Sequence, residues 1–443
     1  MDDICINKEF LQKDNLPFGD ILNQVQFKKI IEEATVHWQE KVYPPLVTLE
    51  AFIKQTLNAD HSCKKAVADI IAKRVANGEE PPTFNTGPYC KARQRLPEDM
   101  IRKLAFATGK SLNDHKSNTW NWRGREVKLA DGTTFTMPDT PENQAEYPQP
   151  KSQKEGCGFP MARCVAVISL SVGAVLGAAI GPYAGKETGE HALFRQLLDL
   201  YSEGDIFLAD RYYCSYYLIA ELQKKGVDVI FQIHASRQID FRKGTSLGEN
   251  DHIVVWKRPN KKPWMTKEEH QAFPETITVR ETDINGQVIV STFLDPKDMT
   301  KADIKDLYSD RWSIEVDLCS IKDTMQMSML RCKTPSMVRK EFYTHLLAYN
   351  LIRIVMAQAA KVKKTFPRSI SFKGTLQIIE SFKPTILAAT RKNLKDVYRC
   401  MLKAIACDPV GHRPGRSEPR AVKQKHKKYD KLQKPRGEYK KMR

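Results

Sequence analysis

Four side chains able to bind phosphate or a metal ion recur at helical spacing between residues 307 and 322. Tyr308, Arg311, Glu315 and Lys322 are separated by three, four and seven positions. At about 100° of turn per residue, they fall on one narrow face of an α-helix. The apolar residues fall on an adjoining face, namely Leu307, Ile314, Leu318, Ile321 and Met325. One continuous helix would therefore pack by its apolar side and present a phenol, two cations and a carboxylate together.

Exposed charge stripes are common, so a surface helix with incidental ion pairs is the alternative interpretation. Two aspartates decide between them, because each stands where a predicted strand ends. Residues 126–131 are typical of a strand that ends in an Asp-Gly turn at Asp131, and residues 205–210 of a buried strand that ends at Asp210. Ligands gather at strand ends in α/β sheets.

Carboxylate oxygens are the ligands that Mg²⁺ prefers. Asp131, Asp210 and Glu315 are therefore the expected catalytic residues and ligands of two Mg²⁺ ions astride a phosphodiester, with Mn²⁺ as the expected substitute. Taken singly, Asp131 also suits a hairpin turn, and Asp210 suits an ion pair with Arg211 or a helix cap.

The four residues of the helical stripe match the Y-x2-R-x3-E-x6-K signature of DDE-type bacterial insertion-sequence transposases, in insertion sequence family four. Two further segments resemble that family in the right order, with residues 131–144 similar to its first-aspartate block and residues 209–216 to its second. The similarity spans roughly residues 80–440, and three ordered blocks are more specific than any one of them.

This resemblance implies a ribonuclease-H-like catalytic core that cuts DNA at the terminal repeats of an insertion sequence and joins the 3′ ends to target DNA. It also implies that Arg311 and Lys322 clamp phosphates, with Tyr308 adding a hydroxyl contact. The implied partners are double-stranded DNA, as terminal inverted repeats and as target, and a second copy of the chain in a homodimer.

Composition agrees with a polyanionic partner. The 443 residues carry 71 Lys and Arg against 53 Asp and Glu, a net charge of +18. An anionic membrane surface and simple solubility are the alternatives, but no amphipathic membrane anchor is recognisable. The ten cysteines include no CxxC pair, and the chain starts without the pattern of a secretory signal. We therefore expect reduced thiols and a cytoplasmic, nucleoid-associated protein.

The longest apolar segment, residues 164–181, has the length of a membrane span. Ser169, Ser171, Gly173 and Gly177 interrupt it, and charged regions flank it. A pair of strands that turns near residues 171–173 accounts for it better, and no membrane contact is expected.

The predicted fold class is mixed α+β, a ribonuclease-H-like core with additions. Its predicted parts are a helical N-terminal DNA-binding domain (1–120), the core's first part (121–236), a β-rich insertion (237–286), the core's second part with the Glu315 helix (287–332), a helical C-terminal region (333–410) and a basic disordered tail (411–443). The tail holds 13 Lys and Arg against three acids, which favours phosphate binding over mere solubility.

Two aromatic or basic clusters are further candidates for DNA contact. Arg93 and Arg95 follow the Pro81-Pro82 turn and suit phosphate or base contacts, or else an ordinary solvated helix face. In the insertion, Trp256 and Trp264 lie among basic residues and are candidates for stacking a base, or else core tryptophans.

Two other functions remain open at this point. A magnesium-dependent nuclease that cleaves without strand transfer would need the same three acids. A non-catalytic relative that only binds DNA ends would share the basic charge, although such a protein would have no need of an intact acidic triad.

Overall fold

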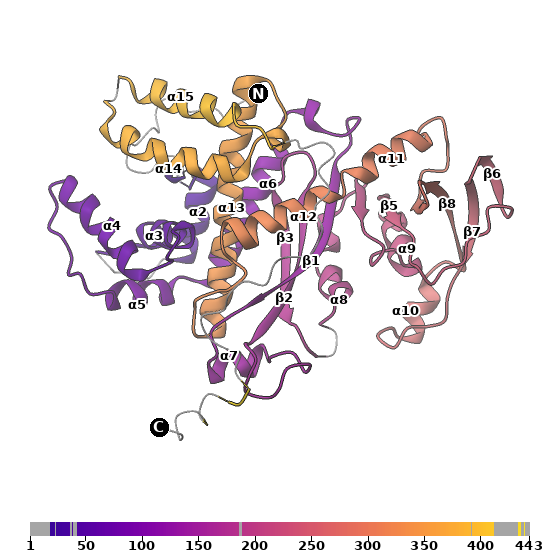
Figure 1. Ribbon diagram of the computed structural model, residues 1–443, viewed down its shortest axis with the longest axis horizontal. Coiled ribbons are helices and arrows are strands. Elements are labelled where there is room, and N and C mark those ends of the chain that lie inside the picture. Colours follow the sequence, from indigo (N-terminus) through magenta and orange to yellow (C-terminus); the bar gives the residue numbers. More distant parts are fainter. Residues whose placement is uncertain are drawn as a thin grey trace.

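The computed structural model describes residues 18–22, 24–35, 38, 42–185, 188–390, 392–411, 433–435 and 438. Most of the predicted basic tail, from residue 412 onward, lies outside the described residues. Figure 1 shows a central sheet with helices gathered on one side and further strands extending on the other.

Nine strands of the described chain form one sheet in the order β3-β2-β1-β4-β5-β9-β8-β7-β6. Their bounds are β1 Val127–Thr136, β2 Met161–Ser169, β3 Val175–Pro182, β4 Ile206–Ala209, β5 Asp228–Gln232, β6 Thr245–Gly248, β7 Asp251–Lys257, β8 Thr276–Ile284 and β9 Gln287–Ser291.

The first five strands form the core predicted from the sequence. β2 runs antiparallel to both β1 and β3, whereas β4 pairs in parallel with β1 and β5 in parallel with β4. The order β3-β2-β1-β4-β5 with an antiparallel β2 is that of a ribonuclease-H-like core. The predicted mixed α+β fold class is therefore confirmed.

The apolar segment 164–181 forms parts of β2 and β3, as predicted. Gly173 turns the chain between them with φ of +72°, a conformation that favours glycine. Among the described residues, no helix is long and apolar enough to cross a membrane.

Six described helices precede the sheet, and two of them, α3 and α6, pack against the later helix α13 (Pro335–Lys363). The six are α1 Gly19–Leu22, α2 Val25–Ala34, α3 Pro45–Leu57, α4 Cys63–Ala76, α5 Gly87–Arg95 and α6 Glu98–Asp114. The predicted break at Pro81-Pro82 falls between α4 and α5. Within the sheet region lie α7 Pro141–Glu146, α8 Glu190–Arg195, α9 Tyr216–Lys224 and α10 Lys267–Ala272. The sequence pattern of residues 190–201 predicts a single helix, but α8 ends at Arg195 and a separate 3₁₀ turn follows at Leu198–Leu200.

Helices after the sheet complete the helical side. They are α11 Lys301–Ser309, α12 Trp312–Cys319, α13 Pro335–Lys363, α14 Phe372–Ala388 and α15 Leu394–Ala406. The apolar sequence of residues 338–355 predicts one long helix with its cap near Thr334, and this helix is α13, which begins after Thr334. The sequence of residues 375–406 predicts further helix, which the structure divides into α14 and α15.

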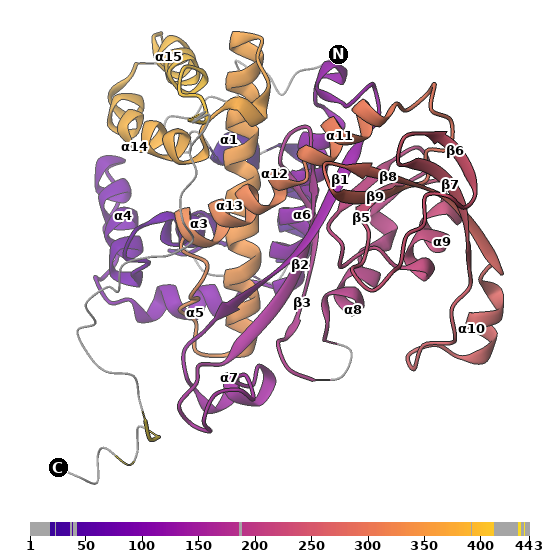
Figure 2. The ribbon, with the colours of Figure 1, turned by 45° about the vertical axis from the view of Figure 1, so that its right-hand side comes forward.

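Two apolar layers enclose the core sheet. On one face, α6, α12 and α13 pack against Val127, Leu129 and Leu208, and on the other α8 and α9 pack against Ala130, Phe207 and Val229. In Figure 2, α13 runs alongside β1–β3 on one side and α8 lies on the other. Successive side chains of a strand point to opposite faces of the sheet, so neighbouring residues of β1 pack in different apolar layers.

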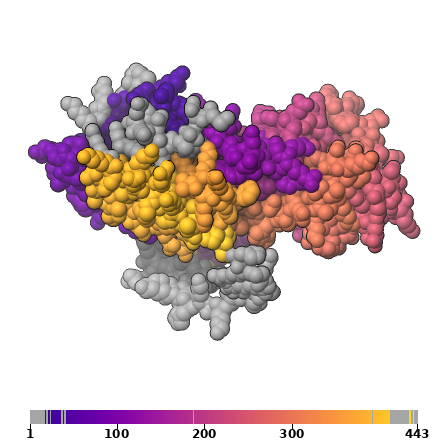
Figure 3. Space-filling model, turned by 90° about the horizontal axis from the view of Figure 1, so that it is seen from above, coloured from indigo at the N-terminus to yellow at the C-terminus, as the bar shows by residue number. Residues whose placement is uncertain are grey.

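The predicted β-rich insertion joins the core sheet directly. β9 pairs antiparallel with β5 and with β8, and β7 and β6 continue outward from β8. Figure 3 shows this region projecting away from the helical side. α10 is held by a capping box between Thr266 and Glu269.

One buried amide joins the helical side to the sheet. Asn350 of α13 donates to the carbonyls of Ala105 and Val175 at 2.8 and 2.9 Å and accepts from the Val175 amide at 2.8 Å. The Asn350 side chain is fully buried. Its replacement by an apolar residue would leave these backbone groups without partners.

We expect Asn350→Leu to lower the free energy of unfolding by about 2–4 kcal/mol, because buried unpaired polar groups are costly. Urea denaturation measures this change, with the exposed Gln377→Leu as the control. Equal stability of the two variants would show that Asn350 does not join the layers.

Candidate active site

The two predicted aspartates lie at the same level of adjacent parallel strands. The last β1–β4 pair is Leu129 with Leu208, and Asp131 and Asp210 each follow that pair by two residues. Adjacent strands lie about 4.8 Å apart. The parallel pairing therefore brings the two carboxylates to one edge of the sheet, where β4 has ended.

The Asp-Gly turn expected at Asp131 is wrong. β1 continues through Asp131-Gly132 to Thr136, because β2 pairs with it along this whole stretch, from Lys128–Ser169 to Thr136–Met161. The Gly132 amide donates to Asp131 Oδ1 at 2.7 Å. Long-range pairing thus overrides the local preference of Asp-Gly for a turn.

The predicted continuous helix from Leu307 through Lys322 is interrupted twice. α11 ends at Ser309, consecutive i→i+3 hydrogen bonds follow around Asp310 and Arg311, and α12 then begins. After Cys319 the chain forms a π-helical turn, Ser320–Thr324. Such turns are frequent at functional sites. The predicted apolar face is confirmed, since all five of its residues are buried in the core.

The polar residues of this segment lie in three different elements. Tyr308 is in α11, Arg311 precedes α12, Glu315 is in α12 and Lys322 is in the π turn. Arg311 Nη1 pairs with Glu315 Oε1 at 3.0 Å. The Tyr308 hydroxyl lies 3.5 Å from Gln232 Oε1 of β5.

Electrostatics indicate that the polar residues share one region. Burial raises the pKa of Tyr308 to about 12, with the Arg311 charge opposing and the Asp210 charge adding to the shift. Burial likewise raises the pKa of the Cys164 thiol in β2 to about 12, with the Lys322 charge opposing it. The π turn therefore brings Lys322 within electrostatic range of the β1–β2 pair.

The pKa of the Asp131 carboxyl is strongly raised. Burial raises its pKa to about 7, the hydrogen bond from Gly132 opposes this, and the charges of Asp210, Glu190 and Glu315 add to it. The three predicted acids therefore interact electrostatically, and a fourth, Glu190, acts with them. Perturbed acids of this kind are typical of functional sites.

Sequence reasoning missed Glu190. It is the first residue of α8, and a Cβ atom added to Gly132 would lie 2.4 Å from Glu190 Cδ and 2.7 Å from Oε1. The Glu190 carboxylate thus fills the space beside Gly132. The only sign of Glu190 in the sequence was that an acidic residue stands at the start of a predicted helix.

The loop after Asp210 is tied to α8. Asp210 Oδ1 accepts from the Tyr212 amide at 2.8 Å, and the His191 ring contacts the Tyr212 carbonyl at 2.7 Å through Nε2. The two rings stack with centroids 4.6 Å apart. This pair fixes Asp210 relative to the beginning of α8.

Asp317, also missed, anchors the helix that carries Glu315. It is fully buried and accepts hydrogen bonds from Arg353 of α13 and from Arg368, the latter at 2.7 Å. Arg368 also donates to the carbonyls of Ser169 and Leu170 at the end of β2. The sequence signal was a carboxylate bordering the apolar face of the predicted helix.

The two N-terminal arginines differ in their surroundings. Arg93 donates to Gln55 Oε1 at 3.0 Å and lies over the Phe52 ring at 4.8 Å, so its guanidinium is engaged within the helical region. Arg95 is exposed and lies over the Trp38 ring at 5.0 Å. Both arginines lie in the last turn of α5, and DNA contact by them stays a prediction.

The two tryptophans of the insertion also differ. Trp256 is buried, donates to Glu281 Oε1 at 2.8 Å and lies under Arg237 at 3.5 Å. Trp264 is 42% exposed and lies under Arg195 at 4.3 Å. Only Trp264 offers a ring face to solvent.

Carboxylates are suitable ligands for a hard divalent cation. As they stand, no three Asp, Glu, His or Cys side chains in the described part of the chain lie close enough together to hold a metal ion. Glu315 is engaged by Arg311 in this conformation. Metal binding by all three acids would therefore require Glu315 to exchange partners.

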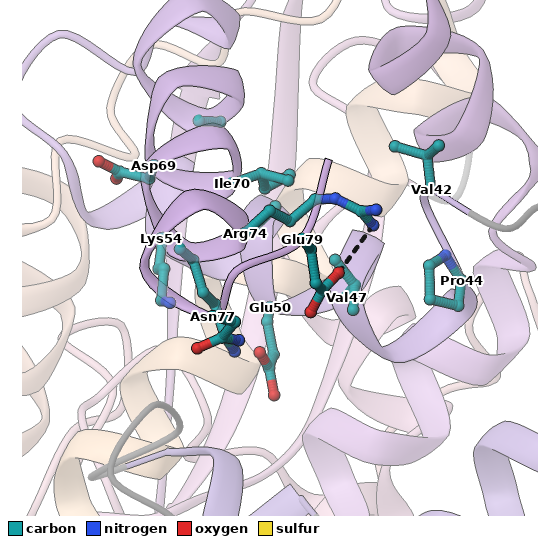
Figure 4. A pocket seen from close by; sticks show the side chains of 13 residues that line it. Val42, Pro44, Val47, Glu50, Lys54, Asp69, Ile70, Arg74, Asn77 and Glu79 are labelled. Carbon is teal, nitrogen blue, oxygen red and sulfur yellow. Dashed lines mark ion pairs between the residues drawn. The ribbon is translucent and has the colours of Figure 1, made fainter. Parts of the chain in front are cut away.

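A separate hollow of about 410 Å³ lies between α3 and α4 (Figure 4). Its charged lining includes Lys54, Asp69, Arg74 and Glu79, and Arg74 pairs with Glu79 at 3.2 Å. None of the predicted site residues lines it.

Comparisons with known proteins agree on one family. The profile of the transposase DDE domain matches residues 122–351, which is 230 of the 443 residues. Transposase InsG for insertion sequence element IS4, from Escherichia coli K12, is 27% identical over 348 residues, covering 76% of each chain. The putative transposase InsZ of the same organism is 28% identical over 137 residues, covering 31% of this chain and 45% of that protein.

Among solved structures, the piggyBac transposase synaptic complex with hairpin DNA aligns with a TM-score of 0.41 and 10% identity. The alignment covers 88% of this chain and 83% of that one.

We expect Asp317→Asn to lower the free energy of unfolding by about 3–5 kcal/mol, because it leaves two arginines without their shared buried carboxylate. Chemical denaturation measures the effect, and Asp306→Asn on the exposed side of α11 is the control. A change below about 1 kcal/mol would contradict the anchoring role.

We expect Asp131→Asn to stabilise the metal-free protein, because the folded state raises the pKa of Asp131 from 3.8 to about 7 and so disfavours the ionised carboxylate. The gain should be absent below about pH 4, grow from pH 4 to 7 and then level off at about 1–3 kcal/mol. Thermal unfolding with a chelator present measures it, with the exposed Asp199→Asn as control. A gain independent of pH would contradict this origin.

Proposed function

The chain belongs to the transposase DDE domain family and is a DNA transposase, and we propose that Asp131, Asp210 and Glu315 are its catalytic acids. The observation that carries this proposal is the register of β1 and β4, in which both aspartates follow the last pair by two residues. The electrostatic influence of Glu315 on Asp131 supports the third assignment.

A transposase DDE domain implies the use of divalent metal ions. We propose that two Mg²⁺ ions, replaceable by Mn²⁺, bind between the three carboxylates. Bound there, they would activate a water or a DNA 3′-hydroxyl and stabilise the leaving oxygen. Asp131 and Asp210, fixed by the sheet, would provide the rigid side of this centre.

Glu315 would provide the adjustable side. Arg311 holds its carboxylate at 3.0 Å. When DNA arrives, Arg311 can exchange Glu315 for a phosphate oxygen, since guanidinium binds phosphate well. This exchange would free Glu315 for the metal as the scissile phosphate enters. Lys322 and Tyr308 would then contact neighbouring phosphates.

The reaction proposed for this centre begins with hydrolysis of a phosphodiester at the end of the insertion sequence. Water attacks phosphorus and the P–O3′ bond breaks, leaving a 3′-hydroxyl on the element and a 5′-phosphate on the flank. That 3′-hydroxyl then attacks a phosphodiester of the opposite strand or of the target. A new P–O3′ bond forms to the element, the P–O3′ bond of the attacked strand breaks, and that strand is left with a free 3′-hydroxyl. Positioning and charge stabilisation account for most of the rate gain in such transfers.

We further propose that two copies of the chain pair two DNA ends, because transposition joins both ends of the element to one target. A strictly monomeric complex that still pairs ends would count against this.

We expect Asp131→Ala, Asp210→Ala and Glu315→Ala each to lower strand cleavage by about 10³-fold or more, while binding to a terminal-repeat duplex is retained. The double variant Asp131→Ala/Glu315→Ala should be no slower than either single variant, because the acids act as a unit. Denaturing gels with DNA carrying the element's own ends and Mg²⁺ measure cleavage, and mobility shift measures binding.

The control is Asp199→Ala, which changes an exposed aspartate that pairs with Lys225. Normal cleavage by any of the three variants would overturn that residue's assignment. Supercoiled target DNA in the same reaction separates the alternatives, because a nuclease without strand transfer yields no joined products and a non-catalytic binder yields no nicks.

A further inference from the structure

Glu190 has an environment that a purely structural role does not explain. It is half-buried at the start of α8, yet within the described residues its carboxylate has no ion pair and no hydrogen bond. Burying an unpaired charge is costly. The one cation whose charge acts on Glu190 in the described part of the chain is Arg163. Arg163 donates through Nη1 to the Thr188 carbonyl at 3.1 Å and lies over the Tyr183 ring at 4.8 Å.

α8 holds Glu190 firmly in this place. Leu193 and Phe194 of α8 are buried in the apolar layer beneath β1 and β2. The neighbouring His191 is stacked on Tyr212 and contacts its carbonyl, which ties α8 to the loop of Asp210. The position of Glu190 relative to both β1 and Asp210 is therefore set by packing.

Gly132 provides the space for the carboxylate. Any side chain at this position would overlap Glu190, since a Cβ would lie 2.4 Å from its Cδ. Asp131 and Gly132 are consecutive in β1, so their side-chain directions face opposite sides of the sheet. Glu190 belongs to α8 and Glu315 to α12. Figures 1 and 2 show these two helices on opposite sides of β1, so Glu190 approaches the strand from the α8 side.

We propose that Glu190 is a fourth carboxylate of the catalytic centre, binding one of the divalent ions from the α8 side of β1, directly or through a water. The inference rests on the proposed function, because it adds a ligand to the same centre. A bound cation would supply the partner that the carboxylate lacks.

The test is Mn²⁺ binding to the full chain without DNA, followed by electron paramagnetic resonance or calorimetry. Glu190→Gln keeps the shape of the side chain and removes its charge, and we expect it to weaken Mn²⁺ binding by about tenfold. Glu221→Gln is the matched control. Glu221 is also a half-buried helical glutamate, but its charged neighbours include Lys225, Lys224 and Arg195, and none of the proposed catalytic acids is among them. The Glu221→Gln variant should therefore bind Mn²⁺ as tightly as the unmodified protein.

A second variant tests the geometry. Gly132→Ala should displace the Glu190 carboxylate and weaken Mn²⁺ binding similarly, and Gly132→Ala/Glu190→Gln should show little further loss, because both changes remove one interaction. Fully additive losses would show that Gly132 acts independently of Glu190.

Asp131→Asn, measured in parallel, separates the two proposals. If Asp131→Asn weakens Mn²⁺ binding and Glu190→Gln binds like the unmodified protein, Glu190 is not a ligand and only this inference fails. If neither variant changes Mn²⁺ binding, the proposed catalytic centre fails as well. If both weaken it, and cleavage by Glu190→Gln requires higher Mn²⁺, the inference holds.

Discussion

The buried carboxylate of Asp317, shared between Arg353 and Arg368, is the interaction on which the arrangement of the site depends. It joins α12 to α13, and through Arg368 it joins both to the end of β2. Glu315 lies two residues before Asp317 in α12, so this contact fixes the position of Glu315 relative to the sheet. A buried ion pair contributes little net stability, but breaking it is costly, and it therefore restricts the positions that its helix can adopt.

The site itself works against stability. Asp131 lies among the negative charges of Asp210, Glu190 and Glu315, and burial adds to their repulsion. The surrounding structure tolerates this because apolar layers cover both faces of the sheet around it. A bound cation would relieve this repulsion. The carboxylates that destabilise the metal-free protein are therefore the groups that would give it affinity for metal ions, and the bound metal would in turn attract DNA phosphate. The excess of Lys and Arg over acids also attracts DNA, and it acts over a longer distance.

The sequence allowed prediction of what depends on periodicity and order. The core strands, the strand pair of residues 164–181, α13 and the apolar face of the Glu315 segment all follow from alternation or helical spacing. The predictions failed where contacts between residues distant in the sequence determine the structure. Pairing with β2 keeps Asp131 and Gly132 in an extended strand in place of the predicted turn. The π turn after Cys319 interrupts a helix that the sequence pattern predicts to be continuous. Glu190 and Asp317 were missed because only the fold shows which charges meet.

The central claim is that acids from β1, the end of β4 and α12 converge on divalent metal. A crystal structure of the protein with a terminal-repeat duplex and Mn²⁺, examined by anomalous scattering, tests it most directly. The account predicts manganese coordinated by Asp131, Asp210 and Glu315, with the Arg311 guanidinium bound to a DNA phosphate and no longer to Glu315. Manganese bound elsewhere, or Glu315 still paired with Arg311 beside bound DNA, would contradict it.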